Sequence, residues 1–178
     1  MRSLKYAILG LIIRNPISGY DIMKEFNEEL VNFWSAKHSQ IYPELKKLVD
    51  EGLVEYTVII TATVLEKKLY SITEKGKRDF LSWLIQIEPL EPTPKEVFRL
   101  RMYYANHIEK EHLKEMLQDQ LDQRVKKLAY LKEAMDNYSE VPATTDVAFG
   151  DYIVLDGAIL REKSSIQWLK NCLKHLEQ

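Results

Sequence analysis

The feature that most restricts the fold of this chain is a helical segment near residues 39–52 that runs directly into two β-type segments. Ile41, Leu45 and Leu48 recur at helical spacing and predict a buried flank. Gly52 predicts the end of that helix, because glycine readily adopts the left-handed backbone that follows many helices. The next segments, LVEYTVII and VLEKKLYSI, are rich in β-branched and aromatic residues and are joined around Thr-Ala-Thr. They predict a β-hairpin.

Two helical stripes precede this segment, and one helix follows the hairpin. Asn15-Pro16 separates the first two stripes, and Ser18 predicts the N-cap of the second. Thr73 opens the last helix. Three helices, a hairpin and a return helix predict a winged helix-turn-helix, in which a β-ribbon is added to the two-helix DNA-binding motif. The two stripes comprise Leu4, Ala7, Ile8, Leu11 and Ile12, and then Tyr20, Ile22, Met23, Phe26 and Leu30.

The second half of the chain is expected to be helical throughout. Helices are predicted near residues 95–107, 109–138 and 150–177. In the last two, apolar residues recur three and four positions apart, with Glu162 interrupting the last stripe. Such stripes are typical of coiled-coil-like packing. Two or three helices have little interior of their own, so they are more stable when they bury these stripes against a second copy of the chain. We therefore expect a homodimer.

Together these patterns predict a mainly α fold with a small β-hairpin. The proline-rich segment EPLEPTP predicts an extended linker between two domains. We expect an N-terminal winged helix-turn-helix DNA-binding domain at residues 1–87, the linker at 88–94, and a C-terminal helical, coiled-coil-like dimerisation domain at 95–178.

Charge and cysteine content restrict the partners and the compartment. The net charge of the 178 residues is −2, and residues 1–85 hold 12 Lys and Arg against 11 Asp and Glu. A nucleic-acid surface must therefore be a local patch rather than a basic domain. Cys172 is the single cysteine, which excludes an intrachain disulfide and fits a reducing cytoplasm. No apolar run approaches the ~18 residues of a membrane span, and MRSLKYAILGLII is interpreted as a core helix rather than a signal peptide.

The third helix has a polar front end opposite its apolar flank. This division is typical of a recognition helix, whose N-terminal side chains meet base edges in the major groove. Gln40 can pair with adenine, and Ser39 can meet a base or a phosphate. Each residue also has a plainer structural interpretation: Ser39 as an N-cap, Lys46 as part of a solvated helix face, and His38 as an ordinary surface histidine. The predicted DNA-binding residues of this helix are Lys37, His38, Ser39, Gln40, Tyr42 and Lys46.

The hairpin offers a second DNA contact. In a winged helix this hairpin, the wing, lies beside the DNA backbone. Lys67 and Lys68 lie on its return strand and are predicted to anchor phosphates. The alternative is that these charges protect an exposed strand edge.

Several quoted segments resemble the PadR family of bacterial transcriptional regulators. They are LKYAILGLI, SGYDIMKEF, FWSAKHSQIYPELKKLVDEGLV and LEKKLYSITEKGK, and REKSSIQWL resembles the dimerisation domain of that family. The resemblance covers essentially the whole chain and is nearest to the phenolic-acid-responsive repressors of the family. It implies a homodimer that binds a palindromic operator in double-stranded DNA upstream of a phenolic acid decarboxylase gene. It also implies release by p-coumaric or ferulic acid, recognition residues as given above, and a wing at residues 66–68.

A phenolic acid needs an aromatic slot and a cation. A site that relieves repression should touch both domains, because a ligand shifts a conformational equilibrium only through its different affinities for the two states. Arg161 is the preferred cation, followed by Lys5. Plain core packing is the alternative for each aromatic residue. The predicted effector-binding residues are Tyr6 and Tyr20 from the first domain, and Phe98, Met102, Tyr152 and Arg161 from the second.

Other functional classes find less support in the sequence. It has no glycine-rich phosphate loop and no nucleophile in a recognisable setting, so we expect no enzyme activity, no cofactor and no metal. His107, Glu111 and His112 come nearest to a metal cluster, because positions 107 and 111 would share a helical face. Two alternatives remain open. One is a winged helix used for protein contacts, and the other is a related repressor that responds to a different aromatic or drug-like effector.

Overall fold

The computed structural model describes residues 2–28, 30, 34, 37–60, 66–90 and 92–177. The chain divides into two compact units, Met1–Glu91 and Pro92–Gln178, and the division falls inside the proline-rich segment EPLEPTP. Among the described residues, no helix combines the length and the apolar character that a bilayer crossing requires.

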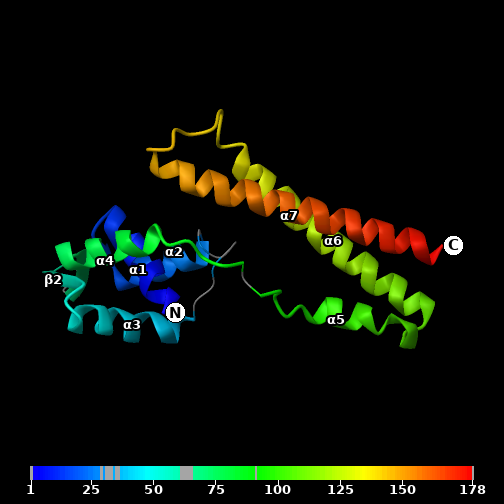
Figure 1. Cartoon of the computed structure of the whole chain (residues 1–178), viewed down its shortest axis with the longest axis horizontal. Coiled ribbons are helices and arrows are strands. Elements are labelled where there is room, and N and C mark those ends of the chain that lie inside the picture. Colours follow the sequence, from blue (N-terminus) through cyan, green and yellow to red (C-terminus); the bar gives the residue numbers. More distant parts are fainter. Residues whose placement is uncertain are drawn as a thin grey trace. The chain divides into compact units, whose positions relative to one another are not determined.

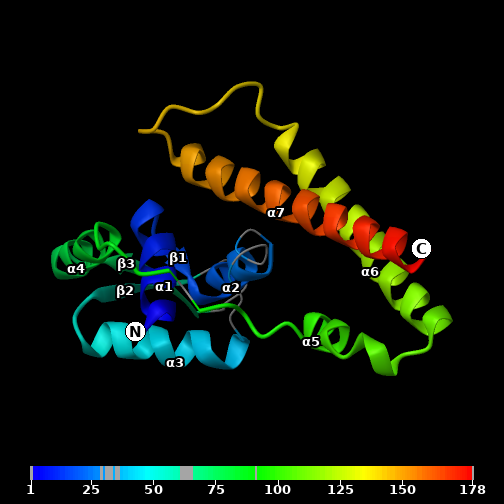
Figure 2. The same ribbon diagram turned by 45° about the vertical axis from the view of Figure 1, so that its right-hand side comes forward.

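In its described residues, the first unit joins a small antiparallel sheet to four α-helices (Figures 1 and 2), which confirms the predicted winged helix-turn-helix. The predicted hairpin is confirmed by strands β2 and β3, whereas the predicted Thr-Ala-Thr turn lies outside the described residues. Figure 2 shows a further short strand, β1, beside β3. Sequence periodicity missed β1 because two residues are too few for an alternating pattern. The elements are α1 (Ser3–Arg14), β1 (Ile17–Ser18), α2 (Gly19–Glu28), α3 (His38–Asp50), β2 (Val54–Ile60), β3 (Glu66–Ile72) and α4 (Glu74–Leu84).

Local capping signals set the boundaries of these elements. The predicted N-cap at Ser18 is confirmed, since its Oγ accepts a hydrogen bond from the Asp21 N–H at 3.2 Å. Thr73 caps α4 in the same way, with Gly76 N–H as the donor at 3.0 Å. Gly52 follows α3 with φ of +66°, in the left-handed region that glycine adopts without strain. The predicted helix starts and the predicted stop therefore rest on local chemistry.

The apolar flank of α3 faces the core of the first unit. Ile41, Leu45 and Leu48 are all buried and pack with side chains of α1 and α2, as the spacing predicts. The sheet and α4 complete the same core through Tyr70 and Phe80. Because the inner flank is fixed in this way, the opposite side of α3 is held outward on a rigid support.

The second unit consists of two long helices with a short helical arm. Helices α6 and α7 run side by side in opposite directions (Figures 1 and 2), which agrees with the predicted coiled-coil-like packing. The helix predicted near residues 95–107 is broken at Tyr104, so that part of the prediction is wrong. Asp146 starts α7 earlier than predicted, because its Oδ1 accepts a hydrogen bond from the Ala148 N–H at 2.8 Å. The elements are α5 (Val97–Tyr103), η2 (Ala105–His107), α6 (Lys110–Met135) and α7 (Val147–Leu176).

Glu162 stays inside the seam between α6 and α7 although it is charged. Its side chain is only 5% exposed. Arg124 Nη1 lies 3.0 and 3.1 Å from its two oxygens, and Lys127 Nζ lies 3.3 Å from Oε1. Two cations from α6 therefore compensate the buried carboxylate, which would otherwise be costly to remove from water.

Candidate nucleic-acid interface

The recognition helix begins at His38, one residue earlier than predicted. Lys37 holds the N-cap position, so the interpretation of Ser39 as the N-cap is wrong. Instead, the Gln40 Oε1 atom accepts a hydrogen bond from the Lys37 N–H at 3.1 Å. This contact is half of a capping box, in which the third helical residue reaches back to the cap. The Gln40 amide nitrogen has no such structural role among the described contacts.

The predicted polar face of α3 is largely solvent-exposed. Lys37, Ser39, Gln40 and Lys46 are exposed, and Tyr42 is 43% exposed. The backbone of His38 lies in the first turn, whereas its side chain lies outside the described part of the structure. The described side chains therefore form a polar strip along the front of a helix whose other side is buried.

Tyr42 also connects α3 to α2. A Cβ atom added at Gly19 would lie 2.8 Å from Cε1 of the Tyr42 ring. The ring thus covers the first residue of α2, where only a glycine leaves room for it. This contact fixes how closely the two helices of the helix-turn-helix approach each other.

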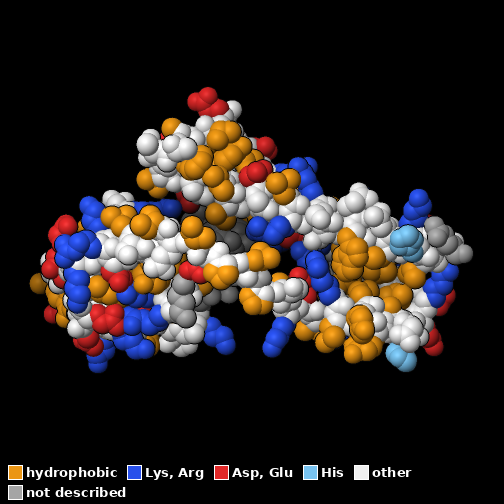
Figure 3. All heavy atoms as spheres, in the orientation of Figure 1, with side chains coloured by type: hydrophobic (Ala, Val, Ile, Leu, Met, Phe, Trp, Pro, Cys, Tyr) orange, Lys and Arg blue, Asp and Glu red, His pale blue; other side chains and the backbone are white. Residues whose placement is uncertain are grey.

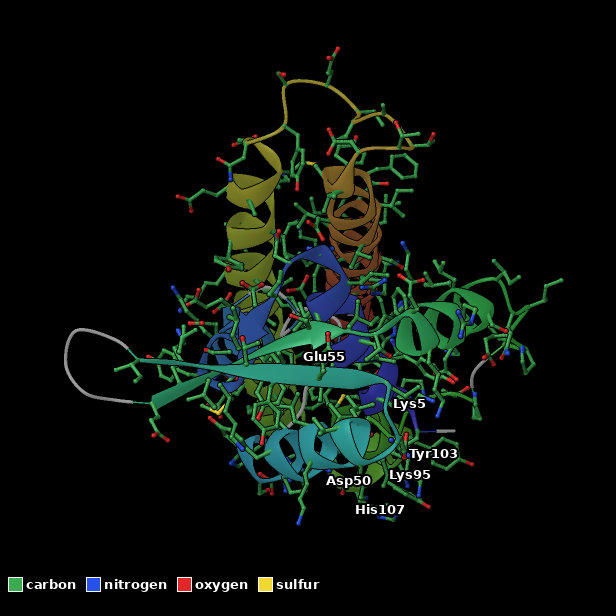
Figure 4. All side chains as sticks on the ribbon, turned by 90° about the vertical axis from the view of Figure 1, so that its left-hand side faces the viewer. Lys5, Asp50, Glu55, Lys95, Tyr103 and His107 are labelled. Atoms are coloured by element: carbon green, nitrogen blue, oxygen red, sulfur yellow. The ribbon has the colours of Figure 1, made fainter. Side chains whose placement is uncertain are left out.

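The two predicted wing lysines have different surroundings. Lys67 Nζ lies 2.9 Å from Asp21 Oδ2 on α2. Lys68 Nζ lies over the Tyr56 ring, 4.1 Å from its centroid. The structure thus brings only Lys67 into an ion pair with the helix-turn-helix. Figure 4 shows the strands running side by side and projecting beyond the helices of this unit, with Glu55 toward their base.

Arg2 makes long-range contacts that sequence analysis missed. Its Nε lies 2.6 Å from Glu44 Oε1, and its Nη atoms bind the carboxylate of Glu51. Both acids belong to α3 or its C-cap, so the start of the chain is tied to the recognition helix. The residues lie more than 40 positions apart, and no local pattern signals such a pair.

Two carboxylates of this unit are held ionised by their neighbours. Hydrogen bonds from Ser18 and then from Lys67 lower the pKa of Asp21 below its ordinary value. Hydrogen bonding from Arg2 lowers the pKa of Glu51. A lowered folded-state pKa adds stability above the unfolded pKa of about 4 and loses it as the pH falls through the folded-state value.

Acid titration of stability should reveal these pairs. We expect the free energy of unfolding to decline between about pH 5 and pH 2, and Asp21→Asn to flatten that decline. The effect should stay within about 1 kcal/mol because the pairs are partly solvated. Urea unfolding at fixed ionic strength measures it, and an unchanged pH profile in Asp21→Asn would contradict the assignment.

The predicted effector residues are distributed over both units. In the first unit, Tyr6 stacks on Trp83 with ring centroids 4.4 Å apart, whereas Tyr20 is 67% exposed on α2. Lys5, the second choice of cation, is paired with Asp79 at 2.7 Å. In the second unit, Phe98 and Met102 pack on the core formed by α6 and α7, and Arg161 is exposed on α7.

Within one copy of the second unit, the aromatic candidates do not share one cavity. The Phe98 ring meets Trp168 edge-on, 6.2 Å between centroids, whereas Tyr152 meets Tyr138 at 5.4 Å. Tyr152 and Trp168 are separated by 16 positions of α7 (168 − 152), which corresponds to about 24 Å along a helix. Within one copy, Tyr152 and the Phe98–Trp168 pair therefore cannot line the same small-molecule pocket.

The histidine positions do not form a metal site in the described part of the chain. Positions 107 and 111 do not share a helical face, because η2 ends at His107 and α6 begins at Lys110. Instead, the Nδ1 atom of His112 lies 3.6 Å from Oε2 of Glu109. No group of three potential metal ligands occurs among the described residues.

Comparison with known proteins identifies relatives of both units. Residues 8–81 match the model of the "Transcriptional regulator PadR-like family", and residues 94–177 match that of "Virulence activator alpha C-term". The negative transcriptional regulator PadR of Bacillus subtilis is 42% identical over the full length of both chains. Its crystal structure with operator DNA aligns with a TM-score of 0.93, 43% identity and coverage of 98% of this chain and 99% of that one. Its crystal structure with p-coumaric acid aligns with a TM-score of 0.85 and 40% identity, and the alignment covers 99% of this chain and 100% of that one.

Proposed function

The chain belongs to the PadR-like family of transcriptional regulators, and from this premise we propose that it is a homodimeric repressor of a phenolic acid stress response. It binds a palindromic operator upstream of a phenolic acid decarboxylase gene in the cytoplasm. A phenolic acid such as p-coumaric or ferulic acid releases it. The chain acts by binding, not by catalysis, as its relatives are regulators rather than enzymes.

The exposed polar front of α3, held on a buried apolar flank, is the observation that carries this proposal. The flank fixes the helix in one orientation, and the front presents hydrogen-bonding groups and lysines at the end that enters a major groove. The Bacillus subtilis relative was crystallised with operator DNA, which supports the same use of the surface in this chain. Lys37, His38, Ser39, Gln40, Tyr42 and Lys46 are the residues that we propose for this contact.

Dimerisation finds support in the surface of the second unit. Figure 3 shows hydrophobic side chains gathered on the visible surface around α5. Val97, Leu100, Tyr103 and Tyr104 are among the large apolar residues that remain exposed there. A second copy is the partner we propose for this surface, because a two-fold dimer would also match a palindromic operator.

The effector is assigned by its chemistry and by the relative that binds p-coumaric acid. A flat ring with a carboxylate suits aromatic side chains together with a cation. Arg161 remains the cation that we propose. Tyr6, Tyr20, Phe98, Met102 and Tyr152 remain separate candidates for an aromatic contact, since Phe98 and Tyr152 do not share one cavity within a copy. A different aromatic or drug-like effector is the second candidate, since the same residue types would accept it.

A gel shift tests operator binding and effector identity together. The full-length protein is titrated onto DNA from upstream of the candidate decarboxylase gene, with and without p-coumarate. We expect a retarded complex that p-coumarate dissolves, whereas benzoate at equal concentration serves as the control. A complex that p-coumarate leaves intact would favour another effector. No complex on any upstream fragment, with a correctly folded dimer, would favour a winged helix used for protein contacts.

Gln40 offers a sharper test of the recognition helix. Gln40→Ala removes both the cap and the amide donor, whereas Gln40→Glu keeps a capping oxygen and replaces the donor by a negatively charged oxygen. We expect Gln40→Ala to lower stability by about 0.5–1 kcal/mol and Gln40→Glu to leave it almost unchanged. Both should lose roughly 1–3 kcal/mol of discrimination at one operator base pair.

The measurement is binding to operators that carry single base-pair changes, alongside thermal unfolding of each variant. If Gln40→Glu discriminates between these operators as the wild type does, Gln40 acts only as a cap.

A further inference from the structure

The wing presents its two neighbouring lysines on opposite faces. Residues directly opposite each other in an antiparallel pair project to the same face, and successive residues alternate. Lys68 is opposite Val58 and Tyr70 is opposite Tyr56, so these four side chains share one face. Lys67 belongs to the other face, together with Leu69, which is paired with Ser18 of β1.

The face that carries Lys67 is tied to the body of the first unit. Asp21 Oδ2 accepts a hydrogen bond from Ser18 Oγ at 2.6 Å and another from Lys67 Nζ at 2.9 Å. Ser18 is buried, and Asp21 lies in the first turn of α2. One carboxylate oxygen therefore joins β1, α2 and the return strand of the wing.

The face that carries Lys68 lies on the side of the recognition helix. Lys68 Nζ sits over the Tyr56 ring, which in turn lies 5.7 Å from the Tyr70 ring between centroids. Burial raises the pKa of Tyr70, and the charge of Lys68 opposes that rise. Tyr70 is buried in the same core as Ile41, Leu45 and Leu48 of α3, so the face that carries Lys68 is the one toward the recognition helix.

The two lysines also differ in whether their ammonium groups are paired with a carboxylate. An ammonium group already paired with a carboxylate is a poor phosphate anchor, because binding DNA would require it to give up that partner. Lys67 has such a partner, whereas no carboxylate is paired with Lys68 among the described residues. The aromatic contact of Lys68 orients its stem and leaves its charge uncompensated.

We infer that Lys68 carries the phosphate contact of the wing, and that Lys67 is a positioning residue which fixes the wing to α2 through Asp21. This inference rests on the proposed function, and it refines the sequence-based prediction that both lysines anchor phosphates. Lys67 then has an indirect role, because its ion pair holds strand β3 in the position from which Lys68 faces the DNA. Asp21 becomes part of the same positioning device.

The salt dependence of operator binding distinguishes a contact from a positioning role. The logarithm of affinity falls with the logarithm of salt concentration by about 0.9 for each phosphate neutralised. For Lys68→Gln we expect the magnitude of this slope to fall by about 0.9 per protomer. For Lys67→Gln we expect an unchanged slope and an affinity weakened by about two- to fivefold, as for the loss of one partly exposed ion pair.

Three further variants separate positioning from a general structural defect. Lys67→Arg keeps the ion pair with Asp21 and should restore nearly wild-type affinity. Asp21→Asn should weaken binding as Lys67→Gln does, and the double variant should be no weaker than either single one. The same pair should show non-additive unfolding temperatures in the absence of DNA.

Several outcomes would overturn the inference while leaving operator binding intact. They are a flattened slope in Lys67→Gln, an unchanged slope in Lys68→Gln, or tighter binding by Asp21→Asn. Failure of the wild type to bind any upstream DNA would instead contradict the proposed function. In that case additive unfolding temperatures for Asp21→Asn and Lys67→Gln would still overturn the positioning role.

Discussion

Replacing Gly76 by alanine is expected to destabilise the first unit by about 3 kcal/mol, a large effect for a single added methyl group. A Cβ atom at this position would lie 2.0 Å from the Leu53 carbonyl oxygen and 2.9 Å from its carbon. The obstacle is backbone, so no rotamer change relieves it. The same carbonyl accepts a hydrogen bond from the Thr73 N–H at 3.1 Å, and moving it would weaken the start of α4. Operator binding should weaken with the fold.

Thermal unfolding followed by circular dichroism measures this effect, as a fall in the midpoint on the order of 15 °C. Gly150→Ala is the matched control, because nothing lies within 4 Å of a Cβ atom built there. Gly150 lies in α7, where alanine should stabilise the helix by about 0.5–1 kcal/mol. Equal midpoints for Gly76→Ala and the wild type would mean that Leu53 and Gly76 are further apart in solution.

The second large effect concerns the buried carboxylate of the second unit. We expect Arg124→Met to destabilise this unit by about 2–3 kcal/mol, because it leaves Glu162 buried with Lys127 as its remaining cation. The estimate is lower than for a fully buried pair, since Arg124 itself is one-third exposed. Glu162→Leu should instead be neutral or stabilising, because it removes the buried charge and extends the apolar seam.

A double-mutant cycle measures the coupling between these residues. Arg124→Met combined with Glu162→Leu should recover most of the stability lost in Arg124→Met alone. Denaturant unfolding of the protein at several concentrations separates loss of fold from loss of any self-association. If Glu162→Leu is as destabilising as Arg124→Met, the ion pairs of Glu162 contribute more stability than the burial of its charge removes.

The sequence determined the features that depend on neighbours a few positions away. The spacing of Ile41, Leu45 and Leu48 identified the buried flank of α3, because a helix repeats its faces every three to four residues. Ser18 and Thr73 identified helix starts, since a cap bonds to an N–H only three positions on. The exposed front of α3 followed from the same periodicity, and with it most of the predicted DNA surface.

The tertiary structure decided which side chains meet across the chain. The pairs Asp21–Lys67, Arg2–Glu44 and Arg124–Glu162 join residues separated by 46, 42 and 38 positions. Alternation along a strand already places Lys67 and Lys68 on opposite faces. Only the tertiary structure shows that Asp21 lies against Lys67 and thereby distinguishes the roles of the two lysines. Gly76 likewise looked like an ordinary helix residue, and only the fold brings the Leu53 carbonyl against it. Local chemistry thus set the elements of this regulator, whereas packing between distant segments assigned roles to individual charges and glycines.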